Sequence, residues 1–248
     1  MGKTSKSIVF LVVYSLMVLA IFFFRLGGNY YIKIVDWLTY ITPLISVFFG
    51  YTTFKYFGKE SKQGKSILIL TFATFLFFAA EVIWNLLGNP VVSIADLFWF
   101  SGFFLIYAAI IYSILMVYGD YFKNKKRVLI IAAISIIVSF FYFKLLPLSW
   151  NSEISPIENV VTTGYIFADL VLIILLVIML SIVFSGSYSL FWIVFALAIL
   201  IRVVSDVLYT LNYESYEVGS MIDLGWLFNY ILFALSFIVL KHKAEALL

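Results

Sequence analysis

The 248-residue sequence has no cysteine and one histidine, and both shortages narrow the chemistry that it can carry. Without cysteine there are no disulfides, thiol nucleophiles, iron–sulfur clusters or cysteine-type zinc sites. The single histidine, His242, stands between two lysines, which is typical of a solvated tail, so a multi-histidine zinc site is excluded as well. We therefore expect no cofactor.

Charged residues are also scarce, at 12% of the chain, whereas 65% of the residues are hydrophobic. Soluble domains contain about 25% charged residues, so this composition predicts an all-α polytopic membrane protein whose partner is the lipid bilayer. At about 20 residues per span, eight transmembrane helices would use about 160 to 190 residues. That leaves no room for an attached kinase, cyclase or nucleotide-binding domain. The net charge of +3 fits basic loops rather than a nucleic-acid partner.

Runs without charged or turn residues predict where these spans lie. The eight expected spans are residues 8–24, 35–57, 66–87, 92–118, 128–143, 160–184, 188–211 and 218–240. We interpret the first as a retained helix rather than a signal peptide, because no small-x-small cleavage site follows it. No lysine lies in the interior of a span, since Lys55 is close to a cytoplasmic helix end, so we do not expect a retinal Schiff base.

Basic residues gather on one side of this topology and predict its orientation. The basic side carries Lys3, Lys6, Lys55, Lys59, Lys62, Lys65, Lys123, Lys125, Lys126, Arg127, Lys241 and Lys243. The other side has only Arg25, Lys33 and Lys144, with Glu153, Glu158, Glu214 and Glu217 nearby. Because positive loops stay in the cytoplasm, we expect a cell-membrane protein with cytoplasmic N- and C-termini.

The chain also repeats itself with an offset of about 125 to 127 residues. Residues 81–84 (EVIW) correspond to 206–209 (DVLY), and 93–99 (SIADLFW) correspond to 220–226 (SMIDLGW). Each unit would contain an even number of spans, so the copies are parallel. The sequence therefore predicts one membrane domain over 1–248, built from two parallel four-helix repeats at about 8–118 and 128–240.

Ionisable side chains inside spans are the candidate functional residues, because each costs about 2.5 to 3.5 kcal/mol at a helix centre. Together with their aromatic neighbours they form the predicted ligand- or ion-binding set, which comprises Glu81, Asp96, Asp169, Arg202, Asp206, Asp223, Trp99, Trp226 and Tyr165. Four-residue spacing would let Arg202 pair with Asp206, and Tyr165 hydrogen-bond to Asp169. Asp169 has no counterpart in the other repeat, which makes it a candidate ligand or proton site.

Two interpretations of the acids stay open at this point. If they share one outer pocket, five acids against one arginine would leave a charge of −4, which would require bound protons or a cationic ligand. If they face separate crevices they are local helix caps, because S-x-x-D at a helix start is itself a capping pattern. The tryptophans near the boundary likewise fit an ordinary aromatic belt.

The two repeat motifs resemble the multi-span N-terminal sensor regions of bacterial diguanylate cyclases and cyclic-di-GMP phosphodiesterases. The resemblance lies in residues 81–84, in Asn89 and Pro90, in 93–97 and 206–209, and in the second-copy pattern Tyr216, Gly219, Asp223, Trp226 and Tyr230. Such regions are usually fused to a cytosolic output domain, whereas this chain ends about eight residues after its last expected span, so the resemblance concerns the sensor without the output domain. Glu81 also stands where aspartate is commoner.

These features predict a non-enzymatic membrane sensor or ligand-binding module with an outward-facing acidic and aromatic pocket. Its partners would be a small-molecule or cation ligand and a cytosolic signalling protein. The signalling protein would contact the basic segments 55–65, 123–127 or 241–243. The sequence does not decide whether the chain forms a homo-oligomer. The alternative is a proton- or cation-coupled transporter or channel. A lipid-modifying enzyme with Asp169 or Glu81 as general base is a third hypothesis.

Overall fold

The computed structural model describes residues 3–121, 125–150, 155–183, 188–212 and 215–246, and these fold into helices without a strand. The helices are α1 (Lys3–Phe24), α2 (Tyr31–Phe57), α3 (Lys62–Leu86), α4 (Ala95–Tyr121), α5 (Lys125–Ser149), α6 (Pro156–Val183), α7 (Ser189–Asn212) and α8 (Met221–Glu245), with a short 3-10 turn at Gly28–Tyr30. Within these ranges all eight are long and apolar enough to cross a membrane. The predicted all-α polytopic architecture is confirmed.

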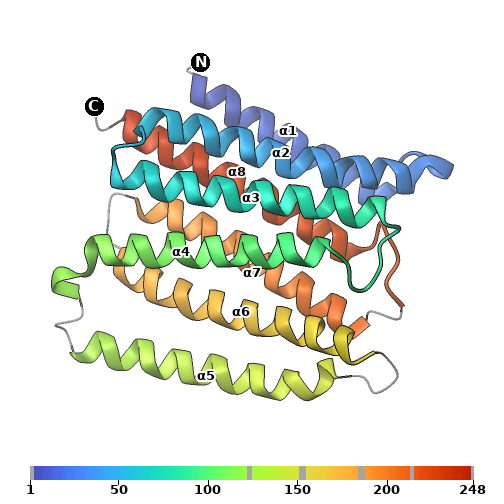
Figure 1. The fold of residues 1–248 in the computed structure, drawn as a ribbon. Helices are drawn as coiled ribbons and strands as arrows, with labels where there is room; N and C mark the ends of the chain where they lie inside the picture. Colours follow the sequence, from blue (N-terminus) through green and yellow to red (C-terminus); the bar gives the residue numbers. More distant parts are fainter. Residues whose placement is uncertain (1–2, 122–124, 151–154, 184–187, 213–214, 247–248) are drawn as a thin grey trace.

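The helices lie side by side (Figure 1), and the contacts among six of them form a closed ring. Around the ring, α2 contacts α3, α3 contacts α4, α4 contacts α6, α6 contacts α7, α7 contacts α8, and α8 returns to α2. Outside it, α1 packs on α8 and α5 packs mainly on α6. The N- and C-termini lie at the same end of the bundle (Figure 1).

The order of the helices in the ring agrees with the predicted duplication for the inner helices but not for the outer ones. The triplets α2–α3–α4 and α6–α7–α8 occupy equivalent places in the ring, as parallel copies would. The outer helices differ, because α1 packs on α8, whereas its proposed counterpart α5 packs mainly on α6 rather than on α4. The two-repeat arrangement therefore stays a prediction.

Helix starts differ from the apolar runs wherever a capping residue intervenes. The fourth helix begins at Ala95 rather than at residue 92, because Ser93 and Asp96 form a cap in which each side chain accepts a backbone N–H. The eighth begins at Met221 rather than at 218, because the turn at Gly219, whose φ is 88°, and the N-cap residue Ser220 precede it. At these two positions apolar content alone placed the start three residues too early. Several helix ends run past the apolar segments, and α5 continues to Ser149.

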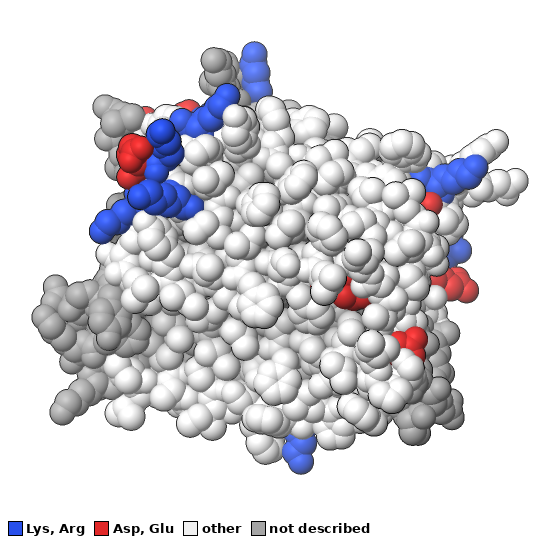
Figure 2. Space-filling model, viewed as in Figure 1, with Lys and Arg blue, Asp and Glu red and all other residues white. Residues whose placement is uncertain are grey.

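The ring interior is filled by large apolar side chains. Phe77, Phe103, Phe195, Phe233 and Phe237 are fully buried there and belong to one hydrophobic cluster. Many other apolar side chains face outward, notably on α1 and α5. Figure 2 shows the result on one face, a broad uncharged surface with most Lys and Arg near the two ends of the helices. This pattern indicates a lipid bilayer environment.

Some residues used to predict the topology lie outside the described part of the chain. They are the acidic Glu153 and Glu214, the basic Lys123, and the side chains of Lys3, Lys125, Lys126 and Arg127. The cytoplasmic placement of both termini stays a prediction.

Candidate ligand-binding site

A cavity of about 70 Å³ lies inside the ring, at the end of the bundle away from the chain termini. This is room for a few water molecules or a small ligand. Its walls come from α3, α4, α6, α7, α8 and the α3–α4 connection. The lining residues are Glu81, Trp84, Val91, Asp96, Trp99, Thr162, Tyr165, Arg202, Asp206, Tyr209, Thr210 and Trp226.

Glu81 joins α3 to α8 at this cavity. Its Oε1 accepts a hydrogen bond of 2.9 Å from the Tyr230 hydroxyl, and both side chains are buried. Tyr230 was not among the predicted site residues. Its signal was its position one turn after Trp226, on the same helix face.

Asp96 combines the capping role with a link to another helix. Its Oδ2 accepts the Ser93 backbone N–H at 2.7 Å, and its Oδ1 accepts the Tyr165 hydroxyl of α6 at 2.6 Å. The expected hydrogen bond between Tyr165 and Asp169 is therefore wrong. The Tyr165 ring stacks on Phe100 of α4 with centroids 4.6 Å apart, which directs the hydroxyl toward α4 instead of along its own helix.

Arg202 and Asp206 form the ion pair that their spacing predicts. The Arg202 Nε lies 3.3 Å from Asp206 Oδ2, and Asp206 Oδ1 accepts the Trp226 indole N–H at 2.6 Å. The guanidinium also lies over two aromatic rings, 4.2 Å from the Phe77 centroid and 4.8 Å from that of Phe103. Phe77 and Phe103 thus stabilise a buried cation, a role that the sequence did not indicate.

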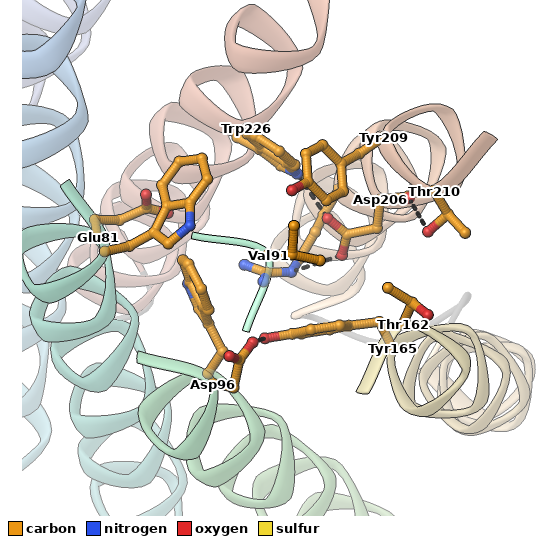
Figure 3. A pocket seen from close by; sticks show the side chains of 12 residues that line it. Glu81, Val91, Asp96, Thr162, Tyr165, Asp206, Tyr209, Thr210 and Trp226 are labelled. Atoms are coloured by element: carbon orange, nitrogen blue, oxygen red, sulfur yellow. Dashed lines mark hydrogen bonds and ion pairs between the residues drawn. The ribbon is translucent and has the colours of Figure 1, made fainter. Parts of the chain in front are cut away.

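Aromatic rings form much of the remaining wall. The ring centroids of Trp84 and Trp99 are 5.9 Å apart, those of Tyr209 and Trp226 are 5.5 Å apart, and Trp84 lies 6.5 Å from Trp226. Figure 3 shows Trp226, Tyr209 and Tyr165 arranged around the space that Asp206 and Asp96 border. The cavity is therefore both acidic and aromatic.

Asp223 lies outside the cavity and has a local structural role. Its carboxylate accepts the Tyr216 hydroxyl at 2.7 Å and the Gly219 backbone N–H at 2.5 Å, which holds the connection into α8. Burial beside this carboxylate raises the pKa of Tyr216, so its hydroxyl stays a proton donor. The Ser220 side chain makes no capping hydrogen bond, unlike Ser93, so the two motif copies cap their helices differently.

Asp169 also lies away from the cavity lining. Its side chain is 0% exposed, and neither carboxyl oxygen has a hydrogen-bond partner among the described residues. The predicted site thus divides into a cavity with three acids and Arg202, a cap at Asp223, and the separate Asp169. Among the described residues, no group of three or more His, Cys, Asp or Glu could hold a metal ion. Val91, Thr162 and Thr210 line the cavity without having been predicted.

No protein-family model, curated protein or solved structure matches this chain. Inference about its function therefore rests on the cavity and the residues around it.

Proposed function

We propose that this chain is a non-enzymatic membrane sensor module that binds a small cationic molecule or ion in the acidic and aromatic cavity. The observation that carries the proposal is the charge of the lining, three carboxyl groups against one guanidinium. The resemblance of the repeat motifs to sensor regions points the same way.

The partners of each acid decide how much negative charge the cavity offers. Arg202 is the cation that pairs with Asp206. Within the part of the chain that the structure describes, the hydrogen-bond donors to Glu81 and Asp96 are neutral, namely the hydroxyls of Tyr230 and Tyr165 and the Ser93 N–H. Neutral donors stabilise a carboxylate without cancelling its charge. A cation entering between Glu81 and Asp96 would supply the missing positive charge.

The aromatic wall favours an organic cation. Ammonium groups are attracted to the faces of tryptophan and tyrosine by about 0.5 to 2 kcal/mol for each contact, more strongly where water is excluded. Trp84, Trp99, Tyr165, Tyr209 and Trp226 all border the cavity. A small amine would therefore combine carboxylate and ring contacts in one site.

Signalling would follow from the position of the cavity within the ring. Its walls come from five of the six ring helices, so a ligand that fits one packing of the ring better than another shifts the population between them. The change would reach a cytosolic partner through the basic segments 55–65, 123–127 or 241–243. This assignment requires cytoplasmic termini in the cell membrane, which the distribution of Lys and Arg supports.

Thermal unfolding of the detergent-purified full chain tests the proposal. The probes are tetramethylammonium, ethanolamine, putrescine, Na⁺ and Mg²⁺, compared for wild type, Glu81→Gln and the control Asp223→Asn. A ligand at about 100 times its Kd stabilises a folded protein by about 2.7 kcal/mol. We expect at least one probe to raise the Tm of wild type and of Asp223→Asn, but not of Glu81→Gln, in which Tyr230 still has an acceptor. Shifts of equal size in all three proteins, or none with any probe, would contradict a cation site in the cavity.

One observation favours transport as a second candidate function. Asp169 lies farther into the bundle than the cavity acids, and intramembrane carboxyl groups often line ion paths. Proton or Na⁺ flux into proteoliposomes that is lost in Asp169→Asn would favour a coupled transporter over a sensor.

A further inference from the structure

Asp169 occupies an unusual place for a carboxyl group. It is the thirteenth residue after Pro156 at the start of α6, so it lies about 20 Å along a helix that rises about 1.5 Å per residue. The side chain is 0% exposed, and both oxygens lack a hydrogen-bond partner within the described residues. Buried polar groups without partners are rare in folded proteins, so this one requires an explanation.

The charged groups that act on Asp169 come from α7 and do not neutralise it. Arg202 and Asp206 are both within electrostatic range. The Arg202 Nε lies 3.3 Å from Asp206 Oδ2, and its guanidinium lies over the rings of Phe77 and Phe103. The positive charge nearby is thus already paired with another carboxylate.

Two tyrosines on the other helices packed on α6 lie within electrostatic range of Asp169. Tyr107 of α4 donates its hydroxyl proton to the Ala168 carbonyl at 2.8 Å. Tyr142 of α5 interacts electrostatically with Asp169, and its buried hydroxyl has no partner among the described residues. The Asp169 carboxyl and the Tyr142 hydroxyl, neither of which has a hydrogen-bond partner among the described residues, therefore occur in the same buried region.

We propose that Asp169 is a proton-binding site whose carboxyl group is neutral at neutral pH. An ionised carboxylate without a partner is costly in a buried apolar setting, and binding one proton removes the charge. The proton also turns the carboxyl into a hydrogen-bond donor, which matches the Tyr142 hydroxyl because a hydroxyl both donates and accepts.

Release of this proton to water would connect Asp169 to the cavity. A charged Asp169 would compete with Asp206 for Arg202, and Arg202 lines the cavity. The proton therefore keeps Arg202 paired at the outer end of the ring. This inference stands apart from the ligand proposal, because it depends on Asp169 and Tyr142 and on no bound molecule.

Infrared difference spectroscopy of the full chain in lipid tests the proton directly. A protonated carboxyl group has a carbonyl stretching band that is separate from the carboxylate bands and shifts in D₂O. We expect the wild-type minus Asp169→Asn spectrum at neutral pH to contain this protonated band. The matched control is Glu158→Gln, which changes an outer acid on the same helix and should remove carboxylate bands only.

Each other outcome overturns the proposal. Carboxylate bands in the wild-type minus Asp169→Asn spectrum would mean that Asp169 is ionised, and a dependence of those bands on Na⁺ would assign the site to a metal cation. Asparagine resembles a neutral aspartic acid in size and polarity, so the variant should fold. If Asp169→Asn fails to fold, the wild-type minus Asp169→Glu spectrum replaces it, and a difference confined to carboxylate bands would show an ionised Asp169 and overturn the proposal. No ligand is added, so failure of the cation-binding test does not affect this result.

Discussion

Arg202 offers the sharpest test of how the site is held together, because one substitution removes two kinds of contact. In Arg202→Leu, the Asp206 carboxylate loses its cation, and the rings of Phe77 and Phe103 lose the guanidinium that lies over them. Removing one partner of a buried pair costs about 3 to 5 kcal/mol. The Asp206 side chain is 10% exposed and keeps the Trp226 N–H, so we expect a loss of about 3 kcal/mol.

Reversible unfolding in mixed micelles, followed by far-UV circular dichroism, measures this loss. Arg202→Lys is the matched variant that keeps the charge but not the planar group, and it should lose less stability than Arg202→Leu. The double variant Arg202→Leu/Asp206→Leu leaves no unpaired charge. It should therefore lose less stability than the sum of the two single variants, and the difference is the coupling energy of the pair.

The loss of stability in Arg202→Leu must be compared with the loss caused by a substitution at a lipid-facing position of α7. Val204 lies on the same helix and is 56% exposed, so Val204→Ala supplies the baseline. If Arg202→Leu destabilises the protein no more than Val204→Ala does, the ion pair contributes nothing to the fold. If the losses of the single variants add to that of the double within about 0.5 kcal/mol, the two residues are not coupled.

Three further predictions use the same unfolding assay. Tyr230→Phe should cost about 1 to 3 kcal/mol, because Glu81 loses a buried donor, and in a Glu81→Gln background the cost should be smaller; equal costs would contradict the hydrogen bond. Ser61→Ala removes the side-chain cap of α3 and should cost about 0.5 to 2 kcal/mol, whereas an unchanged stability would mean that water replaces the cap. Gly102→Ala would place a Cβ against the buried Phe77 ring, so a loss of about 1 to 3 kcal/mol is expected, and a neutral result would show that the ring can move aside.

Sequence patterns predicted those parts of the structure that depend on neighbouring residues. Eight helices follow from the lengths of the uncharged runs, and the Arg202–Asp206 pair follows from a spacing of one helical turn. The starts of α4 and α8 were missed because apolar content does not separate a capping loop from the first helical turn. The capping pattern itself contained that information at Ser93 and Asp96.

The contacts that build the cavity could not be predicted in the same way, because they join helices that are distant in the sequence. Tyr165 and Asp96 are 69 residues apart, and Tyr230 and Glu81 are 149 apart. Which helices face each other depends on the ring order, in particular on α4 contacting α6 rather than α5. For the same reason the sequence could not distinguish Asp206, which lines the cavity, from Asp223, which does not.

Closure of the ring between α2 and α8 also sets an order for biosynthesis. Membrane helices insert first and associate afterwards, and α8 is the last of the described helices to be translated. Until it arrives, α2 has no partner on one side, Glu81 has no Tyr230, and Asp206 has no Trp226. The nascent chain must therefore hold these two acids in an unfinished bundle, and the cavity is completed only when α8 enters the bilayer.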